Sequence, residues 1–484
     1  MDRSRTKLVC TIGPASIERI GEMVAAGMDV ARINFSHGTP DEHKQYVHAV
    51  RAAAHSARRS VAVMADLPGP KIRLGPLSGN ALTLETGSTF TLRPEPEDPA
   101  DTAQEGDATG ASVSTGGLAT QLEAGDRVLL ADGAAELRVT GMDGANVTTE
   151  VVNGGVIRTR SGVNIPSTRL TGDGLTADDR AAVPRALELR VDLIAQSFVR
   201  TAEDVQALRA LLPADGPRLV AKIETRAAVD AFDDIVQIAD GIMVARGDLG
   251  VDIPFEDVPL VQKDLVRRAT RAGRFSIVAT QMLESMTAAP RPTRAEASDV
   301  ANAVLDGADA VMLSAETAIG QFPVEALQAM ARICAKTETD GSALIHTAEL
   351  DPGAEAADAI IAAARFIASR EAADGDTVAL WCFTRSGRTA ELLSLQRPRT
   401  PIVAFTLNPI IARRLAVRSG VIPMVLSSAG GQGEPLLDRM ASAWKAQRNH
   451  ADFGRVILVT TSRRPQGINR IEVHSMGTNA APSH

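Results

Sequence analysis

The chain has 484 residues, of which 44% are hydrophobic and 23% are charged, and its formal net charge is −8. At roughly 150 residues per domain, this length predicts about three domains, each able to bury a core. No basic block dominates any segment, which argues against nucleic acid as a partner. No apolar run approaches the roughly 18 residues of a membrane span. The sequence therefore predicts small-molecule partners, with no nucleic acid and no membrane.

The amino terminus and the cysteines indicate a cytoplasmic protein. Residues 1–7 lack the apolar stretch of a signal peptide. Cys10, Cys334 and Cys382 lie singly inside apolar runs and form no Cys-X-X-Cys pair. This usage is typical of reduced thiols in a core rather than of a disulfide framework.

The first 70 residues alternate predicted strands and helices. Apolar runs predict strands at 7–12, 30–33 and 61–65, and a helix over 16–26. A second helix should begin after Thr39, because Pro40 takes the first helical position and Glu42 lies three residues after the cap.

The next hundred residues show little helical periodicity. Apolar and polar residues alternate over 82–93, which predicts strands. Asp132-Gly133, Asp143-Gly144 and Asn153-Gly154 punctuate apolar runs at hairpin spacing. The acidic, proline-rich stretch 94–107 is typical of a solvated loop. We therefore expect a small all-β insert after the third strand.

The alternation of strands and helices returns at Leu175. Thr176 and Thr201 are predicted to cap helices that end near Leu189 and Leu212. Further strands are expected at 193–196, 218–222, 241–245, 276–279 and 310–313, and further helices at 255–272, 294–305 and 323–339. Outside the insert this makes eight strands, each followed by a helix, which predicts a (β/α)8 barrel.

A new unit begins after Asp351-Pro352-Gly353. An alanine-rich helix to Arg370 and strands near 377–383, 401–406, 421–426 and 455–460 predict an open, doubly wound α/β domain. The predicted fold is thus α/β, with a (β/α)8 TIM barrel at 1–70 and 171–340, a β insert at 71–170 and a C-terminal open α/β domain at 341–484.

Polar residues follow the predicted barrel strands at one register. They are Arg32, Asn34, Ser36 and His37; Asp66, Lys71 and Arg73; Lys222 and Glu224; Arg246 and Asp248; Thr280 and Gln281; and Ser314 and Glu316. Since barrel enzymes carry catalytic groups at the carboxyl ends of their strands, we expect these side chains on one face. Helix caps or solvated loops are the alternative, but they do not explain why cations recur beside carboxylates at the same register.

These residue types favour phosphoryl transfer. Glu224 and Asp248, from neighbouring strands, suit a magnesium ion that keeps several waters. Arg32, Arg73 and Lys222 suit a phosphoryl group, whose transfer needs positioning and charge neutralisation. Taken alone, Lys222 equally suits the Schiff base of a barrel aldolase.

A second cluster lies in the C-terminal domain. Thr384, Arg385, Ser386, Gly387, Arg388 and Thr389 follow an apolar strand and open a helix. Hydroxyls, arginines and a helix N-terminus indicate a phosphate cradle, with an ordinary capping loop as the alternative. Because this loop is in a separate domain from the barrel chemistry, it favours an effector site over a second active site.

Six stretches resemble motifs of the pyruvate kinase family. They are residues 11–16, 31–38, 222–224, 243–250, 279–286 and 312–317. They occur in the family's order and cover nearly all of the predicted barrel. The insert resembles the family's mobile lid, a small β-barrel domain, through its position and through the hinge-like stretch 162–166. The C-terminal domain resembles the family's effector domain through 384–389.

The resemblance implies transfer of the phosphoryl group of phosphoenolpyruvate to ADP, giving pyruvate and ATP in glycolysis. Glu224 and Asp248 would hold Mg²⁺ or Mn²⁺, and Lys222 would neutralise the phosphoryl group in flight. Arg32 and Arg73 would hold phosphates. The lid would close over the barrel mouth and exclude water.

The resemblance also assigns the remaining substrate contacts. Thr280 would lie near the carbon that is protonated. The backbone of Ala245, Arg246, Gly247 and Asp248 would receive the substrate carboxylate. Pro14, Asn34 and His37, with Arg73, would line the nucleotide side.

The chain departs from the family at the potassium site. Asn34, Ser36 and Asp66 match the family's potassium ligands, and Leu67 completes the candidate site. Potassium-dependent members carry Asp-Thr-Lys-Gly-Pro-Glu at the positions of residues 66–71 of this chain. Their final glutamate is replaced here by Lys71. The ammonium group could replace the potassium charge, so we expect K⁺ to be dispensable. Further departures, Glu42 and the pair Arg160-Ser161, concern nucleotide contacts.

Regulation and assembly are also inferred from the resemblance. The loop 462–469 is shorter than in members that bind fructose bisphosphate, so a sugar monophosphate or AMP stands beside fructose bisphosphate as a candidate phosphorylated effector. The family implies a homotetramer. A barrel lyase or aldolase that stabilises an enolate with magnesium, and a metabolite sensor with an inactive barrel, remain as alternative functions.

Overall fold

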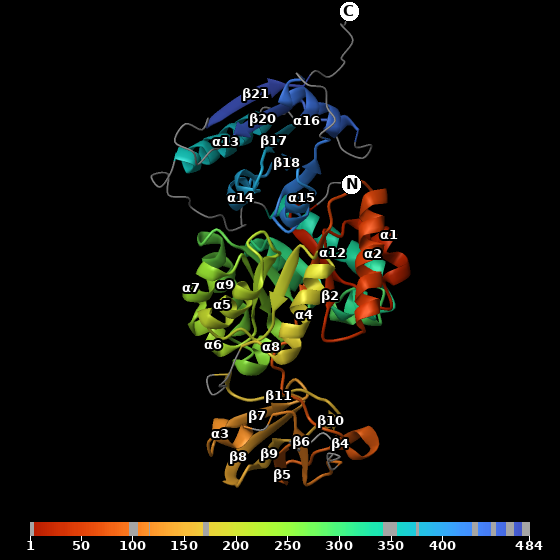
Figure 1. The fold of residues 1–484 in the computed structure, drawn as a ribbon, viewed down its shortest axis with the longest axis vertical. Coiled ribbons are helices and arrows are strands. Elements are labelled where there is room, and N and C mark those ends of the chain that lie inside the picture. Colours follow the sequence, from red (N-terminus) through yellow and green to blue (C-terminus); the bar gives the residue numbers. More distant parts are fainter. Residues whose placement is uncertain are drawn as a thin grey trace, which may run out of the picture.

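The computed structural model describes residues 4–95, 105–115, 117–167, 174–341, 356–373, 377–427, 434–446, 452–460 and 469–476. Three bodies are stacked along the long axis, with the C-terminal α/β domain at the top, the barrel in the middle and the β insert at the bottom (Figure 1). The predicted domain boundaries, at residues 70/71, 170/171 and 340/341, stay predictions.

The barrel is closed by eight parallel strands in the order β1-β16-β15-β14-β13-β12-β3-β2. They are β1 (Lys7–Thr11), β2 (Val30–Asn34), β3 (Ala62–Asp66), β12 (Leu193–Gln196), β13 (Arg218–Ile223), β14 (Gly241–Ala245), β15 (Phe275–Ala279) and β16 (Ala310–Leu313). The predicted (β/α)8 barrel is confirmed. The bounds agree with prediction to within one residue because continuous apolar runs mark strands that are buried on both faces.

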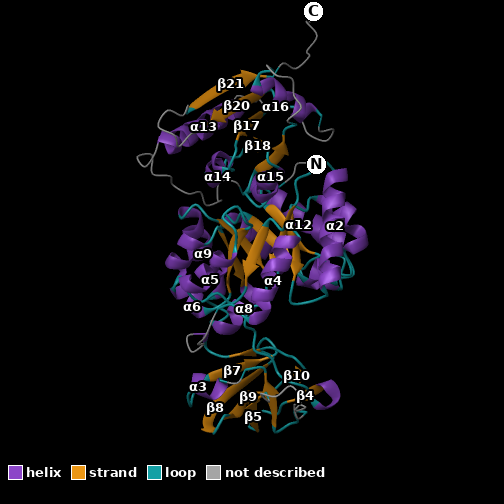
Figure 2. Ribbon diagram, in the orientation of Figure 1, coloured by secondary structure: helices purple, strands orange, loops and turns teal. Residues whose placement is uncertain are grey.

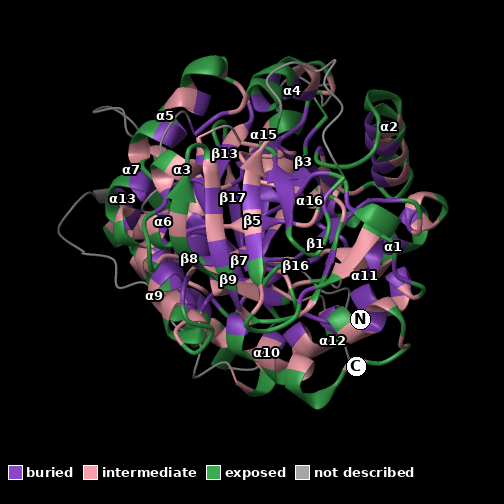
Figure 3. Ribbon diagram, turned by 90° about the horizontal axis from the view of Figure 1, so that it is seen from below, coloured by how far each residue is buried: buried purple, intermediate pink, exposed green. Residues whose placement is uncertain are grey.

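Side chains along each strand alternate between two apolar layers. In β1, Val9 points into the barrel interior, whereas Leu8 and Cys10 pack with the surrounding helices. Ala416 and Val417 of the C-terminal domain join the interior cluster, so they close the amino end of the barrel. Figure 3 shows buried strands at the centre and exposed segments at the rim. All three cysteines are buried and unpaired.

Helices cover the barrel between its strands (Figure 2). They are α1 (Ile20–Ala26) with the preceding turn η1 (Ile17–Arg19), α2 (Pro40–Ser56), α4 (Ala177–Glu188), α5 (Ala202–Leu211), α6 (Arg226–Asp230), α7 (Phe232–Ile238), α8 (Arg246–Asp252), α9 (Val258–Arg271), η4 (Glu284–Thr287), α10 (Arg294–Leu305), α11 (Ala315–Ala318) and α12 (Pro323–Asp340). None of the described helices is long and apolar enough to cross a membrane.

The predicted caps are confirmed with one difference. Thr39 and Thr176 form complete capping boxes with Glu42 and Asp179. Thr201 takes the cap position of α5, but its side chain makes no capping hydrogen bond. The stretch after β14 forms helix α8, which the sequence analysis did not predict and which begins directly at Arg246.

Four aspartates tie the amino ends of the strands together in pairs. Each stands immediately before an even-numbered strand of the barrel and accepts a backbone N–H from the strand before it in the sequence. The pairs are Asp29 with Leu8 (3.1 Å), Asp192 with Val63 (2.9 Å), Asp240 with Leu219 (2.8 Å) and Asp309 with Ser276 (3.1 Å). Each aspartate also pairs with at least one arginine. The sequence analysis did not predict this arrangement.

The insert is all-β apart from η2 (Ser78–Asn80) and α3 (Leu118–Gln121). Its strands are β4 (Ala81–Thr83), β5 (Thr89–Pro94), β6 (Gly110–Val113), β7 (Arg127–Leu130), β8 (Ala135–Asp143), β9 (Asn146–Asn153), β10 (Val156–Arg158) and β11 (Val163–Asn164). Six form one sheet in the order β11-β7-β8-β9-β5-β6, and β10 pairs with β4. The insert buries its own core around Phe90 and Leu137. Most of the predicted 94–107 loop lies outside the described residues.

The C-terminal domain is an open sheet in the order β19-β18-β17-β20-β21. Its elements are α13 (Ala356–Ala373), β17 (Val378–Phe383), α14 (Arg388–Leu395), β18 (Ile402–Thr406), α15 (Pro409–Leu415), β19 (Val421–Val425), α16 (Leu436–Lys445), β20 (Arg455–Thr460) and β21 (Arg470–Ser475). The predicted open α/β domain is confirmed. The antiparallel edge strand β21 was not predicted, although its residues alternate in polarity. Residues 351–353 and 462–468 lie outside the described residues.

Candidate active site

The carboxyl ends of the barrel strands bring the predicted cations and carboxylates together. The ammonium of Lys222 on β13 lies 2.9 Å from Glu224 Oε1 and 3.3 Å from Asp66 Oδ1. Arg32 on β2 donates from Nε to the other Asp66 oxygen at 2.7 Å and from Nη1 to Thr11 Oγ1 at 3.0 Å. Two cations therefore share the Asp66 carboxylate at the end of β3.

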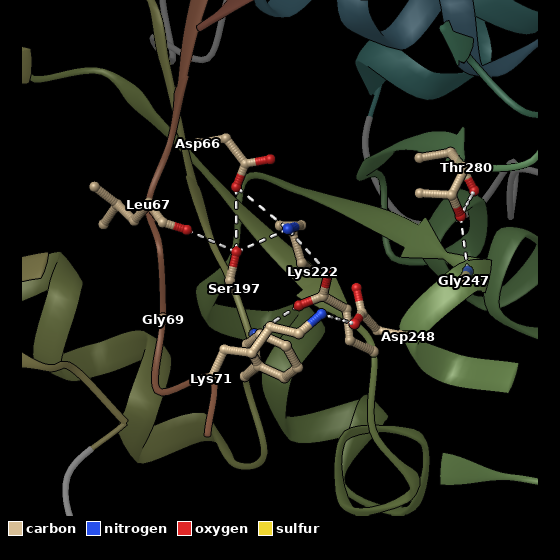
Figure 4. A network of polar contacts seen from close by, with 12 residues as sticks. Asp66, Leu67, Gly69, Lys71, Ser197, Lys222, Gly247, Asp248 and Thr280 are labelled. Atoms are coloured by element: carbon tan, nitrogen blue, oxygen red, sulfur yellow. Dashed lines mark hydrogen bonds and ion pairs between the residues drawn. The ribbon is translucent and has the colours of Figure 1, made fainter. Parts of the chain in front are cut away.

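Ser197 links this group to the loop after β3. Its hydroxyl lies 2.7 Å from the Lys222 ammonium, 3.2 Å from Asp66 Oδ1 and 2.7 Å from the carbonyl oxygen of Leu67, as Figure 4 shows. The hydroxyl accepts from Lys222 and donates to an acceptor on the β3 side. Ser197 thereby fixes the direction in which the Lys222 side chain points.

Burial and pairing set the charges of this group. Burial alone would lower the pKa of Lys222, but Asp66 and Glu224 raise it above its ordinary value. Burial would raise the pKa of Asp66, but Lys222 and Arg32 lower it below its usual range. Lys222 therefore stays protonated and Asp66 ionised near neutral pH, so the site keeps a fixed cation where a phosphoryl group would develop charge.

Glu224 and Asp248 fit a divalent cation. Glu224 is buried, and its Oε2 accepts from the backbone N–H of Phe198 at 2.7 Å. Its Oε1 accepts no hydrogen bond, although the Lys222 ammonium is close. Burial raises the pKa of Glu224, and Asp248 raises it further against the opposing effect of Lys222. Two neighbouring carboxylates are a donor set that Mg²⁺ uses when waters and substrate complete its shell.

The described residues contain no cluster of three or more metal-ligating His, Cys, Asp or Glu side chains. The candidate metal site is thus a two-carboxylate site. This is the ligand number expected where substrate oxygens supply part of the coordination.

Lys71 reaches Asp248 from the first residues of the insert. Its ammonium donates to Asp248 Oδ1 at 2.9 Å and lies 3.5 Å from Asp132 Oδ1 on the β7–β8 turn. Burial would lower the pKa of Lys71, but Asp248 and Asp132 raise it. Lys71 therefore connects the insert to the candidate metal ligand, as the labelled side chains in Figure 4 show.

Thr280 stands on a strained turn after β15. Thr280 and Gln281 have φ angles of 68° and 54°, in the left-handed region that a β-branched residue rarely adopts. Arg246 holds this turn: its Nη2 donates to the Thr280 carbonyl at 2.7 Å, while Nη1 pairs with Asp299 at 2.6 Å. The Thr280 hydroxyl accepts from the Gly247 N–H at 2.7 Å. The side chain of Arg246 thus orients Thr280, and the turn is held against its strain.

The predicted nucleotide-side residues lie at the ends of β1 and β2. Asn34 Oδ1 accepts from the backbone of Ser36 at 3.1 Å, and Pro14, Ser36 and His37 are exposed. Burial lowers the pKa of His37, and the cations Arg73 and Arg32 lower it further.

Arg73 lies where the chain enters the insert. Its Nη1 donates to the Arg160 carbonyl at 3.1 Å, and its backbone forms an isolated antiparallel β-bridge with Gly162. The backbones of Arg73 and Gly162 therefore tie together the two crossings between barrel and insert.

A cavity of about 290 Å³ opens beside Gly247. Arg246, Gln281 and Asp299 of the barrel line it, together with Asp132 of the insert. The space between barrel and insert thus adjoins the strained turn.

Comparison with known proteins decides the family. Residues 3–327 match the family model described as "Pyruvate kinase, barrel domain", and residues 358–474 match the one described as "Pyruvate kinase, alpha/beta domain". The chain belongs to the pyruvate kinase family. The resemblance inferred from the sequence is therefore confirmed, and the chain is a phosphotransferase of this family.

Curated relatives agree over most of the chain. A pyruvate kinase of Geobacillus stearothermophilus is 42% identical over 87% of this chain and 71% of its own length. One of Mycobacterium intracellulare is 40% identical over 98% of both chains. One of Clostridium perfringens is 38% identical over 86% of this chain and 88% of its own length.

Sequence reasoning missed several residues that contact the family site. Ser197 follows β12 and Thr11 ends β1, the two strand ends that the sequence analysis left unassigned. Their position directly after apolar runs was a usable signal. Asp132 and Asp299 carried no such signal, because each reaches the site from a distant element.

The predicted effector loop has the local structure expected of it. The Thr384 hydroxyl accepts from the Gly387 N–H at 2.9 Å, and Gly387, at φ 96°, begins helix α14. Thr384 and Thr389 are buried, whereas Arg385 and Ser386 are exposed. The loop therefore presents an arginine and a hydroxyl to solvent beside a helix N-terminus.

Proposed function

We propose that the protein transfers the phosphoryl group of phosphoenolpyruvate to ADP in a reaction that depends on Mg²⁺ or Mn²⁺, giving pyruvate and ATP in glycolysis. The observation that carries the proposal is the buried Lys222 ammonium between Glu224 and Asp66, with Arg32 on the same carboxylate. A permanent cation there offsets the charge of a phosphoryl group in transfer.

Each neighbouring residue has a distinct part in this proposal. Arg32, fixed by Asp66 and Thr11, would orient the phosphoryl oxygens, and Arg73 would bind phosphate from the side of the insert. Thr280 would hold the proton that the enol takes up, because its hydroxyl is fixed by Gly247. The backbone of Ala245–Asp248 would receive the substrate carboxylate beside it.

Glu224 and Asp248 would hold the divalent cation. When bound, the cation would neutralise phosphoryl and carboxylate oxygens of the substrate and orient them. The raised pKa of Glu224, to which burial and the neighbouring Asp248 carboxylate contribute, supports the assignment.

We propose that potassium is dispensable. Asp66 is already paired with Arg32 and Lys222, and Lys71 adds a third cation at the same face through Asp248 and Asp132. Its raised pKa supports a charge that persists at neutral pH. Asn34, Ser36 and Leu67 would then be structural rather than potassium ligands.

The test is pyruvate formation from phosphoenolpyruvate, ADP and Mg²⁺, with K⁺ present or replaced by tetramethylammonium. We expect strong turnover in both conditions, and a K⁺ requirement in Lys71→Glu. Turnover of wild type only with K⁺ would keep the kinase function and overturn the role of Lys71. ADP-independent formation of pyruvate, or none at all, would instead favour a lyase or a sensor.

Residues 384–389 are proposed to bind a phosphorylated effector, which makes the enzyme allosteric. The exposed Arg385 and Ser386 beside the start of α14 support this assignment. The homotetramer and the cytoplasmic location stay predictions.

A further inference from the structure

A second cavity lies between the amino end of the barrel and the C-terminal domain. Its volume is about 230 Å³, roughly that of several water molecules. The barrel contributes the starts of β13, β14 and β15, and the C-terminal domain contributes α14 and α15, the helices that face the barrel in Figure 1. Neither the active site nor the exposed part of the 384–389 loop lines it.

The lining is strongly basic although the chain as a whole is acidic. Five arginines and two carboxylates face the cavity: Arg218, Arg274, Arg388, Arg414 and Arg418 against Asp240 and Glu391. The two carboxylates are already shared. Arg218 pairs with Asp240 at 3.1 Å and Glu391 at 3.5 Å, and Arg418 lies 3.9 Å from the same Glu391 oxygen. Among the described residues that line the cavity, guanidinium groups therefore outnumber carboxylates.

Arg418 has a buried donor without a partner. Arg418 is 5% exposed, and its Nη2 donates to the Gly273 carbonyl at 3.3 Å. Its other terminal nitrogen, Nη1, is buried and has no hydrogen-bond partner in the described structure. Arg414 Nε is likewise buried and unpaired among the described residues. Buried polar groups without partners cost stability unless a ligand or water satisfies them.

The arginines also repel one another. Burial lowers the pKa of Arg274, and Arg418 and Arg218 lower it further against the opposing effect of Asp240. Burial and then Arg218 lower the pKa of Arg414, against the opposing effects of Asp192, Asp240 and Asp215. An anion in the cavity would relieve this repulsion and link residues of two domains.

We propose that this cavity is a second anion site, which binds a small phosphate monoester between the barrel and the C-terminal domain. Guanidinium groups approach from several elements, and a tetrahedral phosphoryl group offers three acceptor oxygens to them at once. A planar carboxylate offers two. The number and spread of the donors therefore favour a phosphoryl group.

The position of the cavity couples it to the active site by geometry. Arg218, Asp240 and Arg274 stand at the starts of β13, β14 and β15. At the other ends of these strands, Lys222 and Glu224 belong to β13 and the residue after it, Asp248 follows β14, and Thr280 follows β15. A ligand that favours one arrangement of these three strands would shift the groups at both ends together.

The experiment is calorimetric titration of the full-length protein with inorganic phosphate, glycerol 3-phosphate and citrate at fixed ionic strength. Arg418→Gln and Arg218→Gln should each weaken one phosphate site at least about tenfold, since each removes a charged donor. Glu391→Gln should strengthen phosphate binding at the same site, because it removes a competing carboxylate. A gain in affinity cannot be explained by misfolding of the variant.

The controls separate this cavity from other anion sites. Arg271→Gln removes the same charge at an exposed position next to the lining residue Ala272 and should change nothing. Arg32→Gln and Ser386→Ala report the active site and the effector loop, and both should leave the cavity site intact.

Unchanged phosphate binding in Arg218→Gln and Glu391→Gln would overturn the proposal, and these two variants decide the matter if Arg418→Gln fails to fold. Loss of phosphate binding only in Ser386→Ala or only in Arg32→Gln would also overturn it. Tighter binding of citrate than of glycerol 3-phosphate would overturn the assignment to a phosphoryl group.

Discussion

Both ends of the barrel carry buried carboxylates beside cations, but the two ends differ in how completely those carboxylates are hydrogen-bonded. At the amino end, Asp309 receives Arg397 at 2.9 Å on both oxygens, together with backbone N–H groups of Ser276 and Ser419. At the carboxyl end, Glu224 keeps an oxygen without a hydrogen bond, and Thr280 and Gln281 adopt left-handed backbone. The Asp309 carboxylate is fully engaged by protein donors, which suits a structural role. The carboxyl end instead combines an incompletely hydrogen-bonded carboxylate with a strained turn, an arrangement found at functional sites.

The C-terminal domain is fastened to the amino end of the barrel. Arg397 reaches Asp309 of the barrel, and Arg413 reaches Asp192 at 2.7 Å. The insert instead reaches the carboxyl end of the barrel, where Lys71 pairs with Asp248. The comparison therefore predicts that variants at one end lower stability and variants at the other lower turnover.

The largest effect is expected for Lys222→Met. Removing the cation between Asp66 and Glu224 should lower kcat about 10³-fold, the scale of losing a fixed electrostatic group in a dry site. The variant should still fold, because Arg32 still pairs with Asp66 and because Glu224, whose pKa is already raised, can take up a proton. Steady-state kinetics and calorimetry measure both. The matched control is Lys336→Met, which removes an exposed lysine that pairs with Asp340 and should keep full turnover. Retained turnover in Lys222→Met would contradict the assigned role.

Asp309→Asn should act on stability instead. It leaves Arg397 buried without its counter-charge, which costs roughly 3 to 5 kcal/mol when one partner of a buried pair is removed. Denaturant unfolding measures the change. Asp340→Asn, which breaks an exposed pair, should cost less than about 1 kcal/mol. Equal costs for the two variants would show that burial of Asp309 does not matter.

The same aspartate predicts an acid dependence. Burial would raise the pKa of Asp309, but Arg397 and then Arg418 lower it below its ordinary value. A folded pKa below the unfolded value of about 3.9 gives stability that is present above that value and lost as the pH falls through the folded pKa. Wild type should therefore lose more unfolding free energy than Asp309→Asn between about pH 5 and pH 2. Parallel pH curves for the two proteins would contradict this.

The smallest effect tests the strained turn. Gln281 is exposed with φ 54°, so Gln281→Gly should raise stability by up to about 1 kcal/mol through relief of strain. Gln237→Gly, in helix α7, should lower stability by about the same amount because glycine is unfavourable inside a helix. Chemical denaturation compares the two. A loss of stability in Gln281→Gly would mean that the turn is not strained.

The sequence predicted most of the fold because barrel strands are buried on both faces and read as continuous apolar runs. It predicted the capping box at Thr39 and the cap at Thr176 for a similarly local reason. It missed the edge strand β21, whose short alternating pattern is half exposed. It also gave no sign that the stretch after β14 would coil at once into α8, since Gly247 and Gly250 are unfavourable inside a helix.

The sequence by itself determined which residues would stand at the carboxyl ends of the strands, because strand ends are set by local hydrophobic pattern. Arg32, Asp66, Lys222 and Glu224 gather as predicted. Only the tertiary structure decided how they pair, since Ser197, Asp132 and Asp299 reach the site from other elements. The basic cavity between the domains is likewise a product of docking, because its arginines are scattered over 200 residues and become neighbours only when the C-terminal domain closes the barrel.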